Sequence, residues 1–166
     1  MARDMGEYAV GAYLHYIMEC DVVDYGARRR GGGKDGQYEF DVIGFDFDHN
    51  IAYLCEVATH LRGGLNYGGH RVEYTIEKVI EKHLRQTEYS EKHLSMFSAH
   101  VYMFWSTNVP KGKITKALEE RAPELELFIN ERYTSAIREL ETLARIDKSS
   151  TANPFFRCLQ ILHSLR

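Results

Sequence analysis

The sequence predicts an α/β protein with a mixed four-stranded central sheet flanked by helices and with extra helices at the C-terminal end. Three patterns predict this class. Apolar residues recur at helical spacing between residues 4 and 20. Two β-type runs, 38–47 and 51–60, are separated by a short segment of turn residues. The nearly continuous apolar run 99–106 is typical of a central strand that is covered on both faces.

Length and composition predict a single domain over residues 1–166. The chain is long enough to bury a core without disulfides, and its 44% hydrophobic and 27% charged residues are ordinary for a globular protein. The formal net charge of −3 provides no global attraction to polyanions. Any contact with nucleic acid must therefore come from a local basic patch.

Cysteine usage and the N-terminal sequence predict a cytoplasmic protein that does not contact a membrane. Cys20, Cys55 and Cys158 are odd in number and lie in apolar contexts, which indicates buried free thiols in a reducing compartment. The polar start of the chain leads into a helical pattern, and neither a signal-peptide core nor an apolar run of membrane length follows.

The first half of the chain predicts one helix and three strands. The helix covers residues 4–20, with Asp4 as its cap. A strand from 22 to about 29 follows, and the glycine-rich segment 31–36 predicts a loop. The runs 38–47 and 51–60 then predict a hairpin, because Asp-His-Asn between them has turn chemistry.

The second half predicts a long helix, the central strand and further helices. A glycine-rich break near residues 63–69 precedes an apolar stripe that predicts a helix over 72–94. After strand 99–106, one or two helices are expected between 114 and 146, with Pro123 marking a new start. A final helix is expected to begin near Pro154, because proline suits a first helical turn.

The predicted hairpin brings two acids together. If the turn is centred between Asp48 and His49, Asp41 lies directly opposite Glu56. Opposed side chains on antiparallel strands share a face, with Cβ atoms roughly 4.5–5.5 Å apart. Two carboxylates at that distance repel, and a divalent cation between them turns the repulsion into binding. The alternative is that both acids lie solvated at frayed strand ends, and a slip of one residue would place them on opposite faces.

The motifs around these acids resemble a known family. Gly6-Glu7 in the first helix, Glu39-Phe40-Asp41-Val42-Ile43-Gly44 and Leu54-Cys55-Glu56-Val57-Ala58-Thr59 are similar to the core of the PD-(D/E)xK nuclease superfamily, the restriction-endonuclease-like fold. That family includes restriction endonucleases, Holliday-junction resolvases and repair nucleases. Its core order of helix, three strands, helix and strand matches residues 4–107, which leaves 111–166 as a helical C-terminal extension.

The resemblance implies a metal-dependent nuclease that hydrolyses phosphodiester bonds of DNA. By this resemblance Asp41 and Glu56 bind Mg²⁺, with Mn²⁺ as a substitute, and the backbone carbonyl of Val57 is a further ligand. Glu7 corresponds to a first-helix acid that binds the metal directly or through water. For Glu7, a surface carboxylate favoured by the positive end of the helix dipole is an equally open interpretation.

Two positions depart from the family motif. Phe40 replaces its proline, which is a common change. Ala58 replaces its lysine, which in the family positions the attacking water and stabilises charge on the phosphate. Some members supply that lysine from the following helix, where this chain has Lys78 and Lys82; Lys78 is our candidate because it is nearer the start of the helix. A solvated, salt-bridged Lys78 is the alternative, and His60 is a further candidate on the strand face of Glu56, roughly 13 Å along.

The remaining predictions concern partners. Arg28, Arg29, Arg30 and Lys34 surround three glycines in a segment suited to holding DNA phosphates, although a solvated basic hairpin tip has the same composition. Nucleases that cut both strands often dimerise, and the C-terminal helices are candidates for a homodimer interface. Because Ala58 has removed a key group, a catalytically inactive module acting in nucleic-acid binding or protein assembly is the second functional hypothesis.

Overall fold

The structure is a computed structural model that describes residues 4–28, 39–61, 64–67 and 72–165. Its strands are β1 (Val22–Arg28), β2 (Glu39–Asp46), β3 (Ile51–Ala58), β4 (Ala99–Ser106) and β5 (Leu125–Ile129). Its helices are α1 (Met5–Tyr16), α2 (Val72–His93), α3 (Lys113–Arg121), α4 (Glu131–Ile146) and α5 (Pro154–Ser164). The loop predicted at 31–36 lies outside the described residues.

The described strands form a mixed sheet in the order β1-β2-β3-β4-β5. β2 is antiparallel to both of its neighbours, whereas the β3–β4 and β4–β5 pairs are parallel. The α/β class, the hairpin, the long helix α2 and the central strand β4 are therefore confirmed. Strand β3 runs through the middle of the sheet, so its side chains are covered on both faces.

The expected four-stranded sheet is wrong, because the region from 114 to 146 contains a fifth strand. Strand β5 has only five residues, which is too short for its periodicity to distinguish it from a helical segment. It forms because β4 offers it a parallel partner, with Phe104 opposite Leu127 and Trp105 opposite Phe128. Asn130, with a positive φ of 51°, turns the chain from β5 into α4.

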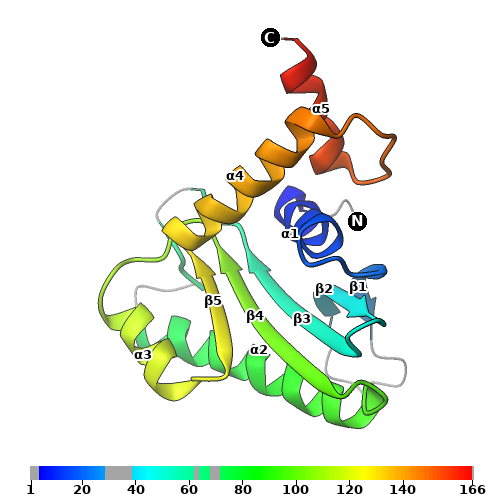
Figure 1. The fold of residues 1–166 in the computed structure, drawn as a ribbon. Coiled ribbons are helices and arrows are strands. Elements are labelled where there is room, and N and C mark those ends of the chain that lie inside the picture. Colours follow the sequence, from blue (N-terminus) through cyan, green and yellow to red (C-terminus); the bar gives the residue numbers. More distant parts are fainter. Residues whose placement is uncertain (1–3, 29–38, 62–63, 68–71, 166) are drawn as a thin grey trace.

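Helices cover both faces of the sheet (Figure 1). Helices α1 and α4 pack on one face, with α5 against both of them, and α2 and α3 lie on the other. Side chains of β3 alternate between the two layers: Tyr53 and Cys55 join the core beneath α1, whereas Ala58 joins the core beneath α2 and α3. Because strand side chains alternate with period two, Glu56 points toward α2.

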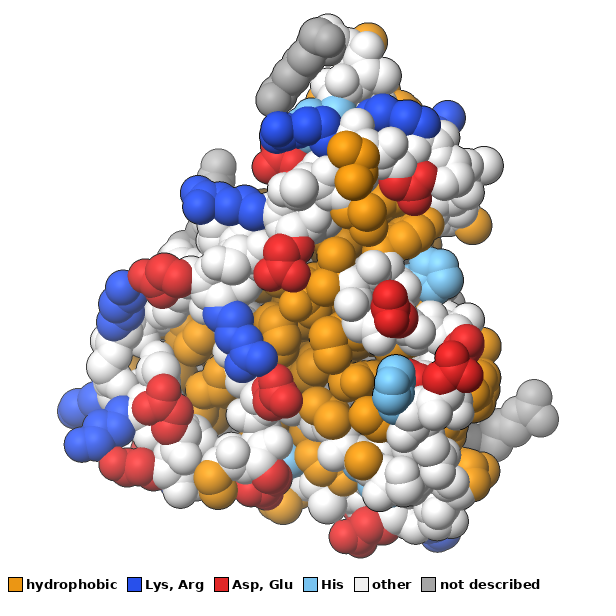
Figure 2. All heavy atoms as spheres, in the orientation of Figure 1, with side chains coloured by type: hydrophobic (Ala, Val, Ile, Leu, Met, Phe, Trp, Pro, Cys, Tyr) orange, Lys and Arg blue, Asp and Glu red, His pale blue; other side chains and the backbone are white. Residues whose placement is uncertain are grey.

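The face under α1 and α4 is only partly covered. Figure 2 shows apolar side chains gathered between these helices and over the strands below them in that view. Partly buried residues at its edge include Ile51, Val101 and Ile137. None of the described helices is both long and apolar enough to cross a membrane.

Two glycines of α1 let it approach the sheet closely. A Cβ on Gly6 would overlap the Thr59 hydroxyl just beyond β3, and one on Gly11 would overlap the Tyr25 hydroxyl on β1. The first turn of the helix, which carries Glu7, is therefore held against the end of strand β3.

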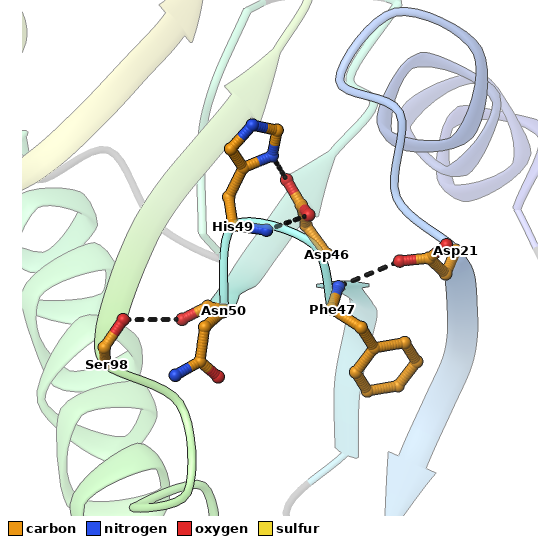
Figure 3. A network of polar contacts seen from close by, with 6 residues as sticks. All are labelled: Asp21, Asp46, Phe47, His49, Asn50 and Ser98. Atoms are coloured by element: carbon orange, nitrogen blue, oxygen red, sulfur yellow. Dashed lines mark hydrogen bonds and ion pairs between the residues drawn. The ribbon is translucent and has the colours of Figure 1, made fainter.

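A network of polar contacts in the β2–β3 turn holds the hairpin register (Figure 3). Asp46 accepts hydrogen bonds from the His49 backbone N–H and contacts the His49 ring, both at 2.8 Å. The Phe47 N–H donates to Asp21 at 2.8 Å. The Ser98 hydroxyl donates to the carbonyl of Asn50, whose positive φ of 59° closes the turn. Because the turn is tied both to the start of β1 and to the segment before β4, a slip of register would break several contacts at once.

The fold predicts that β5 is part of the core and not a surface strand. Phe128 is 4% exposed and stacks on Trp105 with ring centroids 4.0 Å apart. Phe128→Ala should lower the free energy of unfolding by about 3–5 kcal/mol, because it leaves a cavity beside the Trp105 ring. Leu84→Ala, at a position that is 60% exposed, should change it by less than about 0.5 kcal/mol. Urea denaturation measures both, and equal small losses would contradict the packing of β5.

Candidate active site

Asp41 and Glu56 face each other across the hairpin, in the predicted register. Ile43 pairs with Leu54 and Val42 with Cys55, so the next opposed pair is Asp41 and Glu56. The Val57 N–H donates to Asp41 Oδ2 at 2.7 Å, which fixes the aspartate against the neighbouring strand. The frayed, solvated alternative is therefore wrong, because Glu56 is only 6% exposed.

Burial makes this pair of acids costly to ionise. Desolvation, followed by the charge of Asp41, raises the pKa of Glu56 from 4.5 to about 8. Desolvation also raises the pKa of Asp41, although the hydrogen bond from Val57 opposes the shift. Two buried carboxylates in contact need a proton or a cation between them.

Lys82 of α2 supplies one such cation. Its Nζ donates to Glu56 Oε1 from the helix that covers this face of the sheet. Burial by itself would lower the pKa of Lys82, but the charges of Glu56, Tyr67 and Asp41 and the hydrogen bond to Glu56 together outweigh it, and the pKa is raised. The lysine therefore stays protonated beside the two acids.

The structure places Lys82, and not the expected Lys78, at the two carboxylates. Lys78 Nζ binds Glu81 Oε2 at 2.7 Å on the outer side of α2, so it does not reach the carboxylates. Lys82 lies three residues after buried Val79 and four before buried Gln86, which places it on the stripe that faces the sheet. That spacing is present in the sequence, but nearness to the start of the helix was the wrong criterion.

Ala58 leaves the position of the family lysine apolar. It is 5% exposed and packs in the core under α2 and α3, and its carbonyl accepts a hydrogen bond from the Ser106 hydroxyl at 2.9 Å. The ammonium group at this site comes from the helix and not from the strand.

Tyr67 joins the site although the sequence patterns did not single it out. Its ring lies beneath the Lys82 ammonium, with Nζ 5.1 Å from the ring centroid. Burial raises the pKa of Tyr67 to about 12, and its buried hydroxyl has no hydrogen-bond partner within the described part of the chain. His60 contacts the edge of this ring, with centroids 5.9 Å apart, and reaches the site only through Tyr67.

Glu7 lies close enough to Asp41 for the charge of Asp41 to raise its pKa. Asp4 caps α1 by accepting a hydrogen bond from the Gly6 N–H at 2.6 Å. Glu7 follows in the first turn, and its pKa is raised by burial and then by the charge of Asp41. Its role as a helix-dipole partner and its role as an accessory acid are both compatible with this position.

The donor set fits a hard divalent cation in part. Asp41 and Glu56 present carboxylate oxygens on one face, as Mg²⁺ prefers, and the Val57 backbone is held beside Asp41 by its N–H bond. Among residues 4–28, 39–61, 64–67 and 72–165, no three His, Cys, Asp or Glu side chains converge as a metal-binding group. A metal here would therefore need the Val57 carbonyl and water beside the two carboxylates.

The predicted basic loop lies largely outside the described residues. Arg29, Arg30 and Lys34 belong to the segment 29–38, and of Arg28 only the backbone is described, as the last residue of β1.

Comparisons with protein-family models, curated proteins and solved structures returned no match for this chain.

The raised pKa of Glu56 predicts how stability depends on pH. Between about pH 4.5 and 8 the folded protein keeps a proton that the unfolded chain releases, so the free energy of unfolding falls as pH rises through this window. The loss from pH 6 to pH 8 should be on the order of 2 kcal/mol in metal-free buffer. Glu56→Gln should flatten this slope, and Glu91→Gln on the exposed side of α2 should retain it. Urea titrations across this range make the comparison, and an unchanged slope in Glu56→Gln would refute the assignment of the proton.

Proposed function

We propose that this protein is a Mg²⁺-dependent endonuclease that hydrolyses phosphodiester bonds of DNA. The observation that carries the proposal is the contact between Lys82 and Glu56 beside Asp41. The half-buried Asp41, the buried Glu56 and an ammonium group from α2 are the chemical groups of the family motif, which places its two acids on the two strands of the hairpin and its lysine on the second strand. The substitution of the motif lysine by Ala58 thus does not leave the site without a cationic group.

Each residue has a defined part in the proposed reaction. Asp41, Glu56 and the Val57 carbonyl would hold the metal, which supplies a water of lowered pKa and charge stabilisation at the phosphate. Lys82, still protonated, would orient that water and stabilise the negative charge that develops on the phosphate oxygens. Tyr67 holds the Lys82 ammonium in place, and Glu7 assists at the edge of the site.

DNA and a homodimer belong to the same proposal. The basic residues Arg28, Arg29, Arg30 and Lys34 support contact with a phosphate backbone. Arg28 ends β1 opposite Glu39, two residues before Asp41, and the other three follow it in the sequence. A second copy would let the enzyme cut both strands. Three apolar residues are each more than half exposed and support an apolar contact between copies: Ile146 at the end of α4, Leu162 on α5 and Leu165 just after it.

The contact between Lys82 and Glu56 also supports the second candidate, an inactive nuclease-fold module that binds nucleic acid or a protein. Lys82 neutralises part of the carboxylate charge by itself. The pair could therefore be a structural ion cluster that needs no metal. The two candidates differ in whether Mg²⁺ binds and whether DNA is then cut.

Asp41→Ala should abolish Mg²⁺-dependent cleavage of plasmid DNA while leaving the protein folded, because it removes a metal ligand without emptying a core position. Circular dichroism checks the fold, and calorimetric titration with Mg²⁺ or Mn²⁺ should show lost binding. Retained cleavage in the variant would end the proposal. Metal binding by the native protein without cleavage of plasmid, branched or single-stranded DNA would favour the inactive module.

Two lysines of one helix provide a matched test of the catalytic role of Lys82. Lys82→Ala should lower the cleavage rate by about 10²–10³-fold, because charge on the phosphate is no longer stabilised. The Mg²⁺ affinity of Lys82→Ala should be equal to or higher than that of the native protein, because the Lys82 ammonium no longer competes for Glu56. Lys78→Ala, which removes the same charge from the outer side of α2, should leave both quantities unchanged. Single-turnover cleavage assays and calorimetry measure the two effects, and equal rate losses in both variants would contradict the assignment.

A further inference from the structure

A shallow cavity lies beyond the C-terminal ends of β4 and β5, on the side of the sheet that α4 covers. Its volume is about 550 Å³, and it is lined by the segment 107–111 after β4 and by the first half of α4. β3, β4 and β5 are parallel, so their C-terminal ends meet at one edge of the sheet. Glu56 lies near that end of β3, and ligands of open α/β sheets bind outside the carboxyl ends of the strands.

The cavity is joined to the site through the segment 107–111. Thr107 donates to the His60 carbonyl at 3.2 Å, and the Leu65 N–H donates to the Asn108 carbonyl at 2.7 Å. Leu65 is two residues from Tyr67, whose ring lies under Lys82. On the other side, the Asn130 amide both accepts from and donates to the Val109 backbone, at 2.9 and 3.0 Å. The segment is thus held in place from both the active-site side and the α4 side.

The wall that α4 contributes is polar and carries an unpaired cation. Glu131, Thr134, Ser135 and Arg138 follow at positions i, i+3, i+4 and i+7, so they share one face of the helix. Lys111 Nζ binds Glu131 at 2.7 Å, and these two charges cancel. Arg138 makes no ion pair with any other described residue, and the hydroxyl of Ser135 has no partner there either. The Thr134 hydroxyl donates to the Asn130 carbonyl at 3.1 Å, so the cavity has a net positive charge and one hydroxyl donor, that of Ser135.

We infer that this cavity binds a phosphate of the DNA backbone beyond the one that is cut. The inference rests on the proposed function and deepens it by placing the path of the substrate along the carboxyl edge of the sheet. A polynucleotide held at Asp41 and Glu56 presents further phosphates along its strand, and the Arg138 guanidinium with the nearby Ser135 hydroxyl matches their paired oxygens. Such a contact sets position and affinity and does not read sequence.

Arg138→Ala tests the cavity, with Arg145→Ala as its matched control. Both arginines lie on α4 seven residues apart, both are exposed, and only Arg138 lines the cavity. Each substitution removes one charge, so a general electrostatic effect would be equal in the two. Anisotropy of a labelled DNA duplex, measured with full-length protein in EDTA between about 50 and about 200 mM salt, gives the affinity and its salt dependence.

Arg138→Ala should weaken binding about five- to tenfold and lower the slope of log K against log salt by about 0.9, whereas Arg145→Ala should change affinity by less than about twofold. Ser135→Asp, which retains Arg138 but adds a carboxylate to the wall, should weaken binding at least as much. Thermal melting checks that each variant is folded.

Equal effects of Arg138→Ala and Arg145→Ala, or no effect of either, would overturn the inference. So would the absence of DNA binding by the native protein. Because EDTA prevents metal-dependent cleavage, these outcomes are independent of catalysis, which the Asp41 and Lys82 variants decide separately. If the native protein does not cleave DNA but Arg138→Ala still weakens DNA binding, the protein is a DNA-binding module with the cavity as its contact site.

Discussion

The buried contact between Asp41 and Glu56 is the constraint on which the rest of this structure depends. Two acids on facing strands, one of them 6% exposed, cannot both ionise without a cation beside them. The fold meets that requirement with Lys82 from α2, and a bound metal would meet it more completely. The apolar packing of α2 on the sheet brings Lys82 to this point, over the ring of Tyr67. Burial and the charge of Asp41 together raise the pKa of Glu56.

The hairpin turn is what makes the contact reliable. Asp46 holds His49, Asp21 holds the Phe47 backbone, and Ser98 holds Asn50, so three separate parts of the chain agree on one register. A slip of one residue would turn Asp41 to the opposite face of the sheet. The turn lies at the far end of both strands from the acids, yet it decides their geometry.

The position of Lys82 also shows how an ammonium group can lie beside these carboxylates when residue 58 is an alanine. A lysine at position 58 would reach the carboxylates from within β3, whereas Lys82 reaches Glu56 from the covering helix. What places the ammonium group at the carboxylates is its position in the folded structure, and a lysine from either element can occupy that position. Ala58 can then pack in the core under α2, where a charge would be costly.

The sequence by itself determined the α/β class, the hairpin with its register, the long helix and the pairing of Asp41 with Glu56. These follow from local rules: side-chain periodicity, turn residues and the strict alternation of a strand. It failed at β5, whose five residues become a strand only because β4 is present to pair with them. The sequence also did not separate Lys78 from Lys82, because the inward face of a helix is set by the elements against which the helix packs. Tyr67 and the cavity at Arg138 were decided by tertiary structure alone, since they join segments that are distant in the chain and meet only at the carboxyl edge of the sheet.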